Sequence, residues 1–347
     1  MKNSALDVIT IGTAARDALA KSESFRSTDD SHGSGRLECV PLGAKIEIEN
    51  LAFSSGGGAV NAAVTFARQG FKTGIVARVG DDASGDDVRR DLTHEHIDIS
   101  RLIVDRKAPT AFSIVLSSSS GERSVMTHHG AATRWSPDDF HRKPLDARWL
   151  YVSSLGGDFE ALREIFSIAR RHRMKIAMNP GMAEARLPHK LVPFLQNIDV
   201  LIMNREEGAK LTGVSGNDVK EIFRRIDELQ PGIFVLTDGR NGATISDGRR
   251  IYETGIFREK RLVDKTGTGD AFASGFVAGI MRRFEDRPTA PMKDVRAEDI
   301  AYASRLGMAN AAAKVEGMGS QYGLLRKEEF ERDLRWRSLP FRARDAV

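Results

Sequence analysis

The chain has 347 residues, of which 41% are hydrophobic and only 7% aromatic, so aliphatic side chains must fill its core. Its 52 basic and 48 acidic residues give a net charge of +4 and are interspersed, which argues against a nucleic-acid-binding stripe. The one cysteine, Cys39, excludes an intrachain disulfide and suits a reducing cytoplasm. No apolar run approaches the ~18 residues that span a bilayer, and no signal-peptide pattern opens the chain, so we expect no membrane partner.

The first third of the chain predicts short strands, two helices and one polar insertion. An apolar run at 7–12 indicates a buried strand, and residues 21–36 have the polar composition of a mobile loop or flap. Apolar residues alternate over 44–53, which is typical of exposed strands with one apolar face. The other elements predicted up to residue 127 are helices at 59–69 and 84–95 and strands at 73–79, 101–105, 110–117 and 123–127.

From about residue 148 onward, short apolar runs alternate with helical stretches, which predicts a parallel sheet covered by helices on both faces. The predicted strands lie at 149–152, 175–178, 200–203 and 233–236, and the helices at 159–171, 184–196, 205–212 and 218–229. A β-meander at 243–257 and two long helices at 268–284 and 297–314 complete this part.

These elements predict an α/β protein whose residues 1–347 form one domain with a small lid. We assign the lid to segments at about 14–55 and 101–127, and the core to about 56–100 and 128–335. The arginines that gather between Arg332 and Arg344 are interpreted as a helix end followed by a frayed tail.

The strongest local signal is Asp264-Lys-Thr-Gly-Thr-Gly-Asp270, which precedes an apolar helix of small residues. Gly267 and Gly269 leave backbone N–H groups accessible at a helix N-terminus, where partial positive charge favours an anion. Such a site suits a phosphoryl group whose charge grows during transfer, and Asp270 is placed to take a proton from a hydroxyl nucleophile. Taken alone, the motif is equally well explained as a loop with an N-capping aspartate.

A second signal is Gly56-Gly-Gly-Ala-Val-Asn61, followed by Ala63, Gly70 and Gly80. The glycines allow a small molecule to approach backbone amides, and Asn61 offers a donor and an acceptor, as recognition of vicinal hydroxyls requires. Taken alone, this motif is also explained as a glycine hinge before a core helix. The pairing of the two motifs favours the functional interpretation of both.

In this order, the two motifs resemble those of the ribokinase-like (PfkB family) carbohydrate kinases, whose signatures read GGxxxN and DTxGAGD. The resemblance covers nearly the whole chain and implies a three-layer α/β sandwich with a mainly parallel central sheet and a small β-strand lid. It also implies ATP and Mg²⁺ as cofactors, with K⁺ as a further candidate, and a homodimer formed through the lid strands. The sequence contains no GxxxxGK[ST], which excludes a P-loop enzyme.

Residue by residue, the resemblance implies a role for each matching position. The catalytic base is matched by Asp270, and the anion hole by Gly267, Thr268 and Gly269. The acceptor-binding positions are matched by Asp17, Gly56, Gly57 and Asn61. The positions near the nucleotide are matched by Asn204, Thr237, Gly239, Thr266 and Gly319. The metal positions are matched by Glu207, which would organise Mg²⁺ through water, and by Asp264, a candidate ligand of a monovalent cation.

Some of these positions depart from the family pattern or have simpler explanations. Lys265 replaces a small Thr or Ser and either brings a cation to the phosphates or points to solvent. Thr268 replaces Ala, which an anion hole made of backbone N–H groups tolerates. The segment 204–207 alone would be interpreted as a helix N-cap with a capping-box Glu. Asn179-Pro-Gly181 is interpreted as a turn at the end of a strand, and the resemblance implies a similar loop near the nucleotide.

We therefore expect a cytoplasmic kinase that transfers the γ-phosphoryl group of ATP to a hydroxyl of a sugar or sugar-like molecule. One alternative is a nucleoside acceptor such as adenosine, but Phe53 and Phe112 are the main aromatic residues of the expected lid, and base stacking would want more. Another alternative is a catalytically silent, sugar-binding regulator with the same fold. The intact Asp270 and glycines argue against it, and ADP release would distinguish the two.

Overall fold

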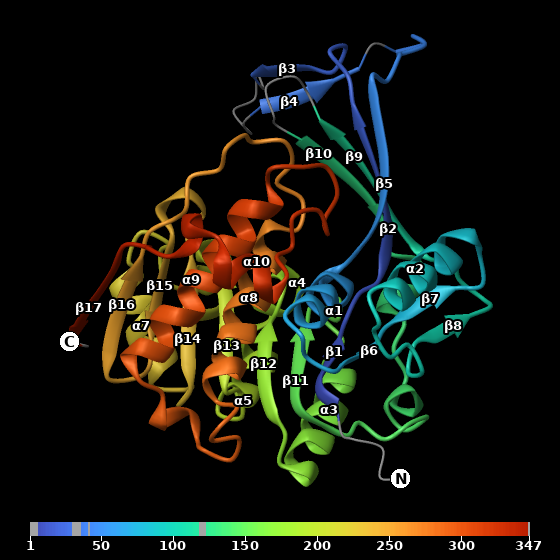
Figure 1. Cartoon of the computed structure of the whole chain (residues 1–347). Coiled ribbons are helices and arrows are strands. Elements are labelled where there is room, and N and C mark those ends of the chain that lie inside the picture. The colour runs from blue at the N-terminus through green and yellow to red at the C-terminus, as the bar shows by residue number, and fades with distance from the viewer. Residues whose placement is uncertain (1–5, 30–35, 41, 118–122, 346–347) are drawn as a thin grey trace.

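The computed structural model describes residues 6–29, 36–40, 42–117 and 123–345 and is built around one large β-sheet (Figure 1). In the order of the sheet, its strands are β17 (Phe341–Asp345), β16 (Arg250–Thr254), β15 (Ala243–Ser246), β14 (Ile233–Thr237), β13 (Val200–Asn204), β12 (Lys175–Asn179), β11 (Ala147–Ser153), β1 (Leu6–Ile11) and β6 (Thr73–Val76). The strands from β14 to β6 pair in parallel, whereas β15, β16 and β17 are added as antiparallel strands.

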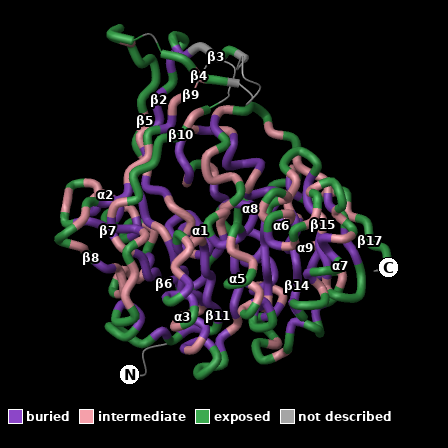
Figure 2. The backbone as a smooth tube through the Cα atoms, turned by 180° about the vertical axis from the view of Figure 1, so that it is seen from behind, coloured by how far each residue is buried: buried purple, intermediate pink, exposed green. Residues whose placement is uncertain are grey.

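Helices cover both faces of this sheet, as predicted for apolar parallel strands. Because side chains alternate across a strand, Val8 of β1 packs into one helical layer while Ile9 and Ile11 pack into the other. The first layer contains α1 (Gly58–Arg68), α8 (Thr268–Arg283) and α9 (Ala297–Lys314). The second contains α3 (Phe159–His172), α5 (Pro188–Leu195), α6 (Arg205–Thr212) and α7 (Val219–Asp227). Figures 1 and 2 show these layers from opposite sides, and Figure 2 shows the sheet strands as mostly buried.

Helix α8, which carries Asp270 in its first turn, is buried along most of its length, as its small apolar residues predicted. It packs closely against α9 through glycine. A Cβ atom on Gly279 would lie only 2.4 Å from the Cα of Ala303, so the two helices could not approach this closely with a larger residue there. This packing fixes the position of the N-terminal end of α8 relative to the sheet.

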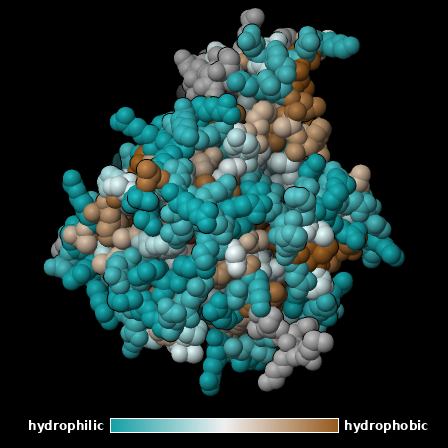
Figure 3. Space-filling model, viewed as in Figure 1, coloured by the Kyte–Doolittle hydropathy of each residue, from teal (hydrophilic) through white to brown (hydrophobic). Residues whose placement is uncertain are grey.

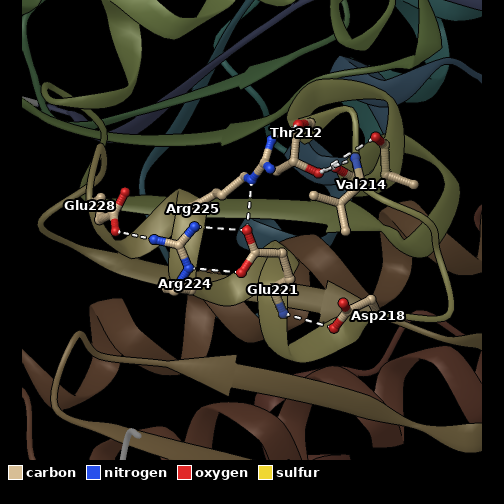
Figure 4. Close-up of polar contacts among 9 residues, drawn as sticks. Thr212, Val214, Asp218, Glu221, Arg224, Arg225 and Glu228 are labelled. Atoms are coloured by element: carbon tan, nitrogen blue, oxygen red, sulfur yellow. Dashed lines mark hydrogen bonds and ion pairs between the residues drawn. The ribbon is translucent and has the colours of Figure 1, made fainter.

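Helix α7 shows how charged residues stabilise the helices that face solvent (Figure 4). The Asp218 carboxylate caps its N-terminus by accepting a hydrogen bond from Glu221 N. Hydrogen bonds from Arg224 and Arg225 lower the pKa of Glu221 to about 2. These pairs lie at i,i+3 and i,i+4 spacing on an exposed surface, where each contributes little to stability.

A second, smaller sheet projects from the core (Figure 1). Its strands lie in the order β10 (Arg123–His128), β9 (Ala111–Ser117), β2 (Ala15–Lys21) and β5 (Asn50–Gly56). Strands β2 and β9 pair in parallel, and the other pairs are antiparallel. The strand expected at 101–105 is found as β8 (Ile103–Asp105), which pairs with β7 (Arg78–Gly80) beside helix α2 (Ala83–His94) instead of joining this sheet.

Two polar segments form more regular structure than we predicted. Part of the expected flap at 21–36 is a pair of antiparallel strands, β3 (Arg26–Asp29) and β4 (Arg36–Cys39), while residues 30–35 lie outside the described residues. The expected frayed tail is wrong, because helix α10 (Lys327–Arg332) is followed by β17 at the edge of the large sheet. The Phe341 ring stacks on Tyr252 of β16, which secures this otherwise exposed edge strand.

The remaining regular elements are short. They are α4 (Met182–Ala185) and the 3₁₀ turns η1 (Gly130–Thr133), η2 (Pro137–Phe140), η3 (Gly239–Asn241), η4 (Met292–Asp294) and η5 (Leu334–Trp336). Among the described residues, none of the helices combines the length and the apolar character needed to cross a membrane.

Candidate active site

The N-terminus of α8 presents free backbone donors beside a carboxylate. Gly267 is the N-cap and has a positive φ of 73°, which favours glycine. The N–H and hydroxyl of Thr268 both donate to the carbonyl of Lys265, so this N–H, which we predicted to bind an anion, is already used. The next two N–H groups, of Gly269 and Asp270, have no acceptor among the described residues and remain available to an anionic group.

Asp270 is held by the helix that follows the second glycine motif. Asn61 on α1 is only 2% exposed, and its Nδ2 donates a hydrogen bond of 2.8 Å to Asp270 Oδ2. Burial raises the pKa of Asp270 above its ordinary value, and the Asn61 bond partly counteracts that increase. The buried Oδ1 of Asn61 accepts no hydrogen bond from the part of the chain that the structure describes, so the same side chain retains one free acceptor.

The start of α1 brings its backbone close to the same carboxylate. Gly57 has a φ of 93°, and a Cβ atom there would lie 2.5 Å from the carbonyl oxygen of Thr13. The Thr13 hydroxyl accepts a hydrogen bond of 3.1 Å from Gly58 N. Glycine is required at position 57 for both its conformation and this close approach.

A cavity of about 250 Å³ opens in front of Asp270, at the carboxyl ends of the parallel strands. This is the edge at which open α/β sheets bind ligands. The residues that line it are Thr13, Gly58, Ser153, Ser154, Asn179, Pro180, Gly181, Ile202, Asn204, Glu207, Thr237, Gly269 and Asp270. The cavity thus brings together Asp270 and Gly269 with three residues predicted to lie near the nucleotide or the metal.

Glu207 takes part in the N-terminal capping box of α6 and also lines this cavity. Its carboxylate accepts a hydrogen bond of 2.8 Å from Asn204 N, and Asn204 Oδ1 accepts one of 2.9 Å from Glu207 N, which completes a capping box. Burial raises the pKa of Glu207 to about 7, and the carboxylates of Glu184 and Asp270 add to the increase. The neighbouring carboxylates make a bound cation favourable here. Mg²⁺ suits the site because it prefers oxygen ligands and retains several waters.

Asp17 faces the site from the small sheet. It lies on β2 and is buried, and burial raises the pKa of its carboxyl group while hydrogen bonds from Ser113 and Ser320 lower it. The charge of Asp270 also raises this pKa, which places the two carboxylates within electrostatic reach of each other. A Cβ atom on Gly56 would lie 2.1 Å from Asp17 Oδ2, so glycine at position 56 leaves room for this carboxylate.

Asp264 organises the loop that leads into α8. Its Oδ1 accepts hydrogen bonds from the N–H and hydroxyl of Thr266, and its Oδ2 accepts one of 3.1 Å from Gly319 N. Lys314 Nζ lies 3.0 Å from Oδ2 and 2.8 Å from the carbonyl oxygen of the same residue. A lysine ammonium therefore already occupies the space between the two kinds of oxygen, and the residues around Asp264 do not fit the K⁺ ion that we expected there.

Most of the predicted site residues fall into three groups. Asp270, Asn61, Gly269, Asn204, Glu207 and Thr237 meet at or beside the cavity, Asp17 and Gly56 lie on the side of the small sheet, and Thr266 and Gly319 bind Asp264. Gly239 lies in the turn after β14 and does not line the cavity. The cavity residues Ser153 and Ser154 were not predicted, and neither was Lys314. Asn179 was interpreted as part of a turn that resembles a loop near the nucleotide in the family, and its position at the end of β12 puts it at this edge.

Comparison with known proteins shows the family of the chain. The model of the pfkB family of carbohydrate kinases matches residues 6–327. The chain is 28% identical to a fructokinase from Klebsiella pneumoniae, with 80% of this chain and 91% of that protein covered. It is 26% identical to a nucleoside kinase from Methanothermobacter thermautotrophicus, with 91% of both covered.

Solved structures show the same fold. Ribokinase from Giardia lamblia superposes with a TM-score of 0.78 at 20% identity, covering 94% of this chain and 99% of that one. Adenosine kinase from Sinorhizobium meliloti gives a TM-score of 0.74 at 20% identity, with 95% and 99% covered. The ribokinase-like α/β fold predicted from the sequence is confirmed, and the chain belongs to the pfkB family of carbohydrate kinases.

Proposed function

We propose that the protein transfers the γ-phosphoryl group of ATP to a hydroxyl of a sugar or sugar-like molecule, with Asp270 as the general base. The observation that carries this proposal is the Asp270 carboxylate beside two free N–H groups at the head of α8, facing the cavity. In the reaction, Asp270 takes the proton of the acceptor hydroxyl while that oxygen bonds to the γ-phosphorus. The bond from this phosphorus to the bridging oxygen breaks, and ADP leaves with the electron pair.

The remaining site residues bind the two substrates and offset the negative charge of the phosphates. The N–H groups of Gly269 and Asp270 donate to the phosphoryl oxygens as their charge grows. The acceptor is oriented by Asp17 and by the free Oδ1 of Asn61, both of which accept hydrogen bonds from hydroxyl groups. Glu207 would hold Mg²⁺ through water, and the ion, when bound, offsets the negative charge of the phosphates.

The inner face of the small sheet favours a sugar over a nucleoside. Asp17 is paired with Ser54 and Ser113, and because side chains alternate, residues at even spacing from these share its face. In the described strands the residues on that face include Leu19, Ala52, Ser54, Ser113, Val115, Arg123, Val125 and Thr127. None of these is aromatic, whereas Phe53 and Phe112 lie on the opposite face. A base would find hydroxyls, aliphatic groups and the Arg123 guanidinium there, but no aromatic ring on which to stack.

The test is ADP release from Mg·ATP over a panel of ribose, fructose, 2-keto-3-deoxygluconate, inositol, adenosine and cytidine. We expect one sugar-like acceptor to stimulate turnover. Preferential turnover of adenosine or cytidine would show that the acceptor is a nucleoside and not a sugar. If no acceptor is phosphorylated while a sugar still raises the Tm, the protein is a sugar-binding regulator and the kinase proposal fails.

The raised pKa of Glu207 predicts that Mg²⁺ binds more tightly as the pH rises. Its pKa of about 7 lies above the ordinary value of 4.5, so in the metal-free protein the stability falls as the pH rises from 4.5 to 7 and stays lower above that range. Mg²⁺ must displace this proton, and its affinity in the presence of ATP should increase by about ten-fold from pH 6 to pH 8. Titration calorimetry at several pH values measures this change.

The variant Glu207→Gln separates this effect from protonation of ATP itself. It should bind Mg·ATP more weakly and lose the part of the pH dependence that comes from the protein. Glu228→Gln, at the exposed C-cap position that follows α7, is the control and should behave as the wild type. An equal pH dependence in wild type and Glu207→Gln would remove Glu207 from the metal site.

We further propose a homodimer formed through the outer face of the small sheet. Figure 3 shows hydrophobic side chains over these strands, and Leu51 and Phe53 are each 56% exposed, with Ile114 and Met126 on the same face. An exposed apolar sheet face of this kind is normally covered by a partner. The double variant Phe53→Asp, Met126→Asp should be a monomer by light scattering. Val104→Asp, on an exposed strand outside this sheet, should leave the mass unchanged.

A further inference from the structure

Lys314 is a fully buried lysine at the last position of α9, and its charge is paired with the Asp264 carboxylate, which the Arg123 guanidinium also approaches, at 3.7 Å. Its side chain is 0% exposed, and its Nζ donates to both the carbonyl and the Oδ2 of Asp264. A buried ammonium is retained only where it is paired and hydrogen-bonded. Burial lowers the pKa of Lys314, whereas the adjacent Asp264 carboxylate raises it, and the ammonium in turn lowers the pKa of Asp264.

This ammonium connects three segments of the chain that meet next to the N-terminal end of α8. The Asp264 carboxylate that it binds also accepts hydrogen bonds from Thr266, in the loop before α8, and from Gly319, in the loop after α9. The backbone N–H groups of Val263 and Asp264 both donate to the carbonyl of Val315, one residue beyond the lysine. The loop that ends in the N-cap Gly267 is therefore held mainly through the oxygens of Asp264.

The ammonium binds two oxygens of the kinds that a monovalent cation binds. A main-chain carbonyl oxygen and a carboxylate oxygen of one residue converge on Nζ at hydrogen-bonding distance. A K⁺ ion binds the same kinds of oxygen, but it could reach them only by displacing the ammonium from a site with no solvent access. Lysine at the C-terminal end of a helix is also favoured by the helix dipole, so α9 stabilises the charge in place.

We propose that the Lys314 ammonium is a covalently attached monovalent cation that holds Asp264 and the loop before α8 in place, so that the enzyme needs no K⁺. This inference rests on the proposed role of the α8 N-terminus in binding the phosphoryl group. Lys314 is a positioning residue, since it acts on the reacting groups only through Asp264 and the loop.

The first experiment uses the wild-type protein in KCl, NaCl and tetramethylammonium chloride at one ionic strength. We expect the same Tm and the same rate of ADP release in all three salts. A Tm that is higher in KCl than in NaCl, or Rb⁺ bound at Asp264 in crystals, would overturn the proposal. The Tm and Rb⁺ measurements do not depend on turnover, so they test this inference even if no acceptor is phosphorylated and the proposed kinase function fails.

The second experiment removes the ammonium. Lys314→Ala should lose stability and lower kcat at least ten-fold, and K⁺ or NH₄⁺, but not tetramethylammonium, should restore part of both by entering the vacated space. Lys220→Ala, on the exposed surface of α7, is the control and should match the wild type in every salt. If Lys314→Ala keeps the wild-type Tm and rate without responding to K⁺, the proposal is wrong. If Lys314→Ala does not fold, the same measurements on Lys314→Met and the comparison of salts in the wild-type protein test the proposal.

Discussion

Replacing Asp270 by Asn is expected to lower kcat by about 10²–10⁴ and to leave the KM values for acceptor and ATP nearly unchanged. The amide has almost the shape of the carboxylate, and its oxygen can still accept the hydrogen bond from Asn61 Nδ2 that now measures 2.8 Å. What it cannot do is take the proton of the acceptor hydroxyl. The loss should therefore appear in the chemical step, which single-turnover measurements of ADP formation report directly.

The folded protein should tolerate this change or gain stability from it. Burial raises the pKa of Asp270, which means that the ionised side chain costs folding free energy at pH values above that pKa. Asn removes this cost. We expect a Tm equal to or above that of the wild type at pH 8, with the difference shrinking as the pH falls and Asp270 becomes protonated.

The chain offers a matched control just beyond the C-terminal end of α8. Asp286 is exposed just beyond α8, and Asp286→Asn should change neither kcat nor the Tm. Turnover by Asp270→Asn within a few-fold of the wild-type rate would show that another group, or the phosphate itself, takes the proton. A large fall in the Tm of Asp270→Asn would instead make the role of this residue structural.

Local sequence signals predicted the elements of the core well, because each was carried by residues close together in the chain. Apolar runs located the parallel strands, and the small residues from Ala271 onward correctly predicted a buried helix. The glycine and asparagine motif placed Asn61 on a helix start, and the structure brings it to Asp270 from 209 residues away in the chain. This meeting was expected only from the family resemblance, since neither motif alone specifies its partner.

No usable local signal exists where tertiary contacts override composition. The segment from Phe341 to Asp345 is charged and exposed except for its aromatic residue, and such edge strands look like polar tails. Lys314 ends a helix, where a surface lysine is the ordinary expectation, and its burial depends on Asp264, 50 residues earlier. The use of the Thr268 N–H by the Lys265 carbonyl depends on the turn geometry, which spacing alone does not reveal.

The second large effect is expected on binding of the acceptor. Asp17→Ala should lower kcat/KM for the acceptor by about 10–100-fold, mostly through KM, because a hydrogen bond between a charged group and a hydroxyl contributes about 1.5–3 kcal/mol. KM for ATP should stay within a few-fold of the wild-type value, because the carboxylate lies on the small sheet, outside the residues that line the cavity in front of Asp270. Steady-state kinetics with each substrate varied in turn measures both parameters.

Gly56→Ala tests the same carboxylate without removing it. The added methyl group would lie 2.1 Å from Asp17 Oδ2 and must push that side chain aside, while the nearest atom of any other residue is Ser320 Oγ at 3.1 Å. Gly56→Ala should therefore reproduce most of the effect of Asp17→Ala on the KM for the acceptor. When the two changes are combined, the alanine at 56 no longer meets a carboxylate and should add little further loss.

This double-mutant cycle distinguishes a binding role from general disruption of the small sheet. If Gly56→Ala weakens acceptor binding only by displacing Asp17, the double variant will resemble Asp17→Ala alone in both KM and Tm. If the two losses instead add in full, Gly56 acts independently, for example by letting the acceptor approach its backbone, and the carboxylate explains only its own share. A kcat/KM for Asp17→Ala equal to that of the wild type would remove Asp17 from acceptor binding altogether, whatever the result at position 56.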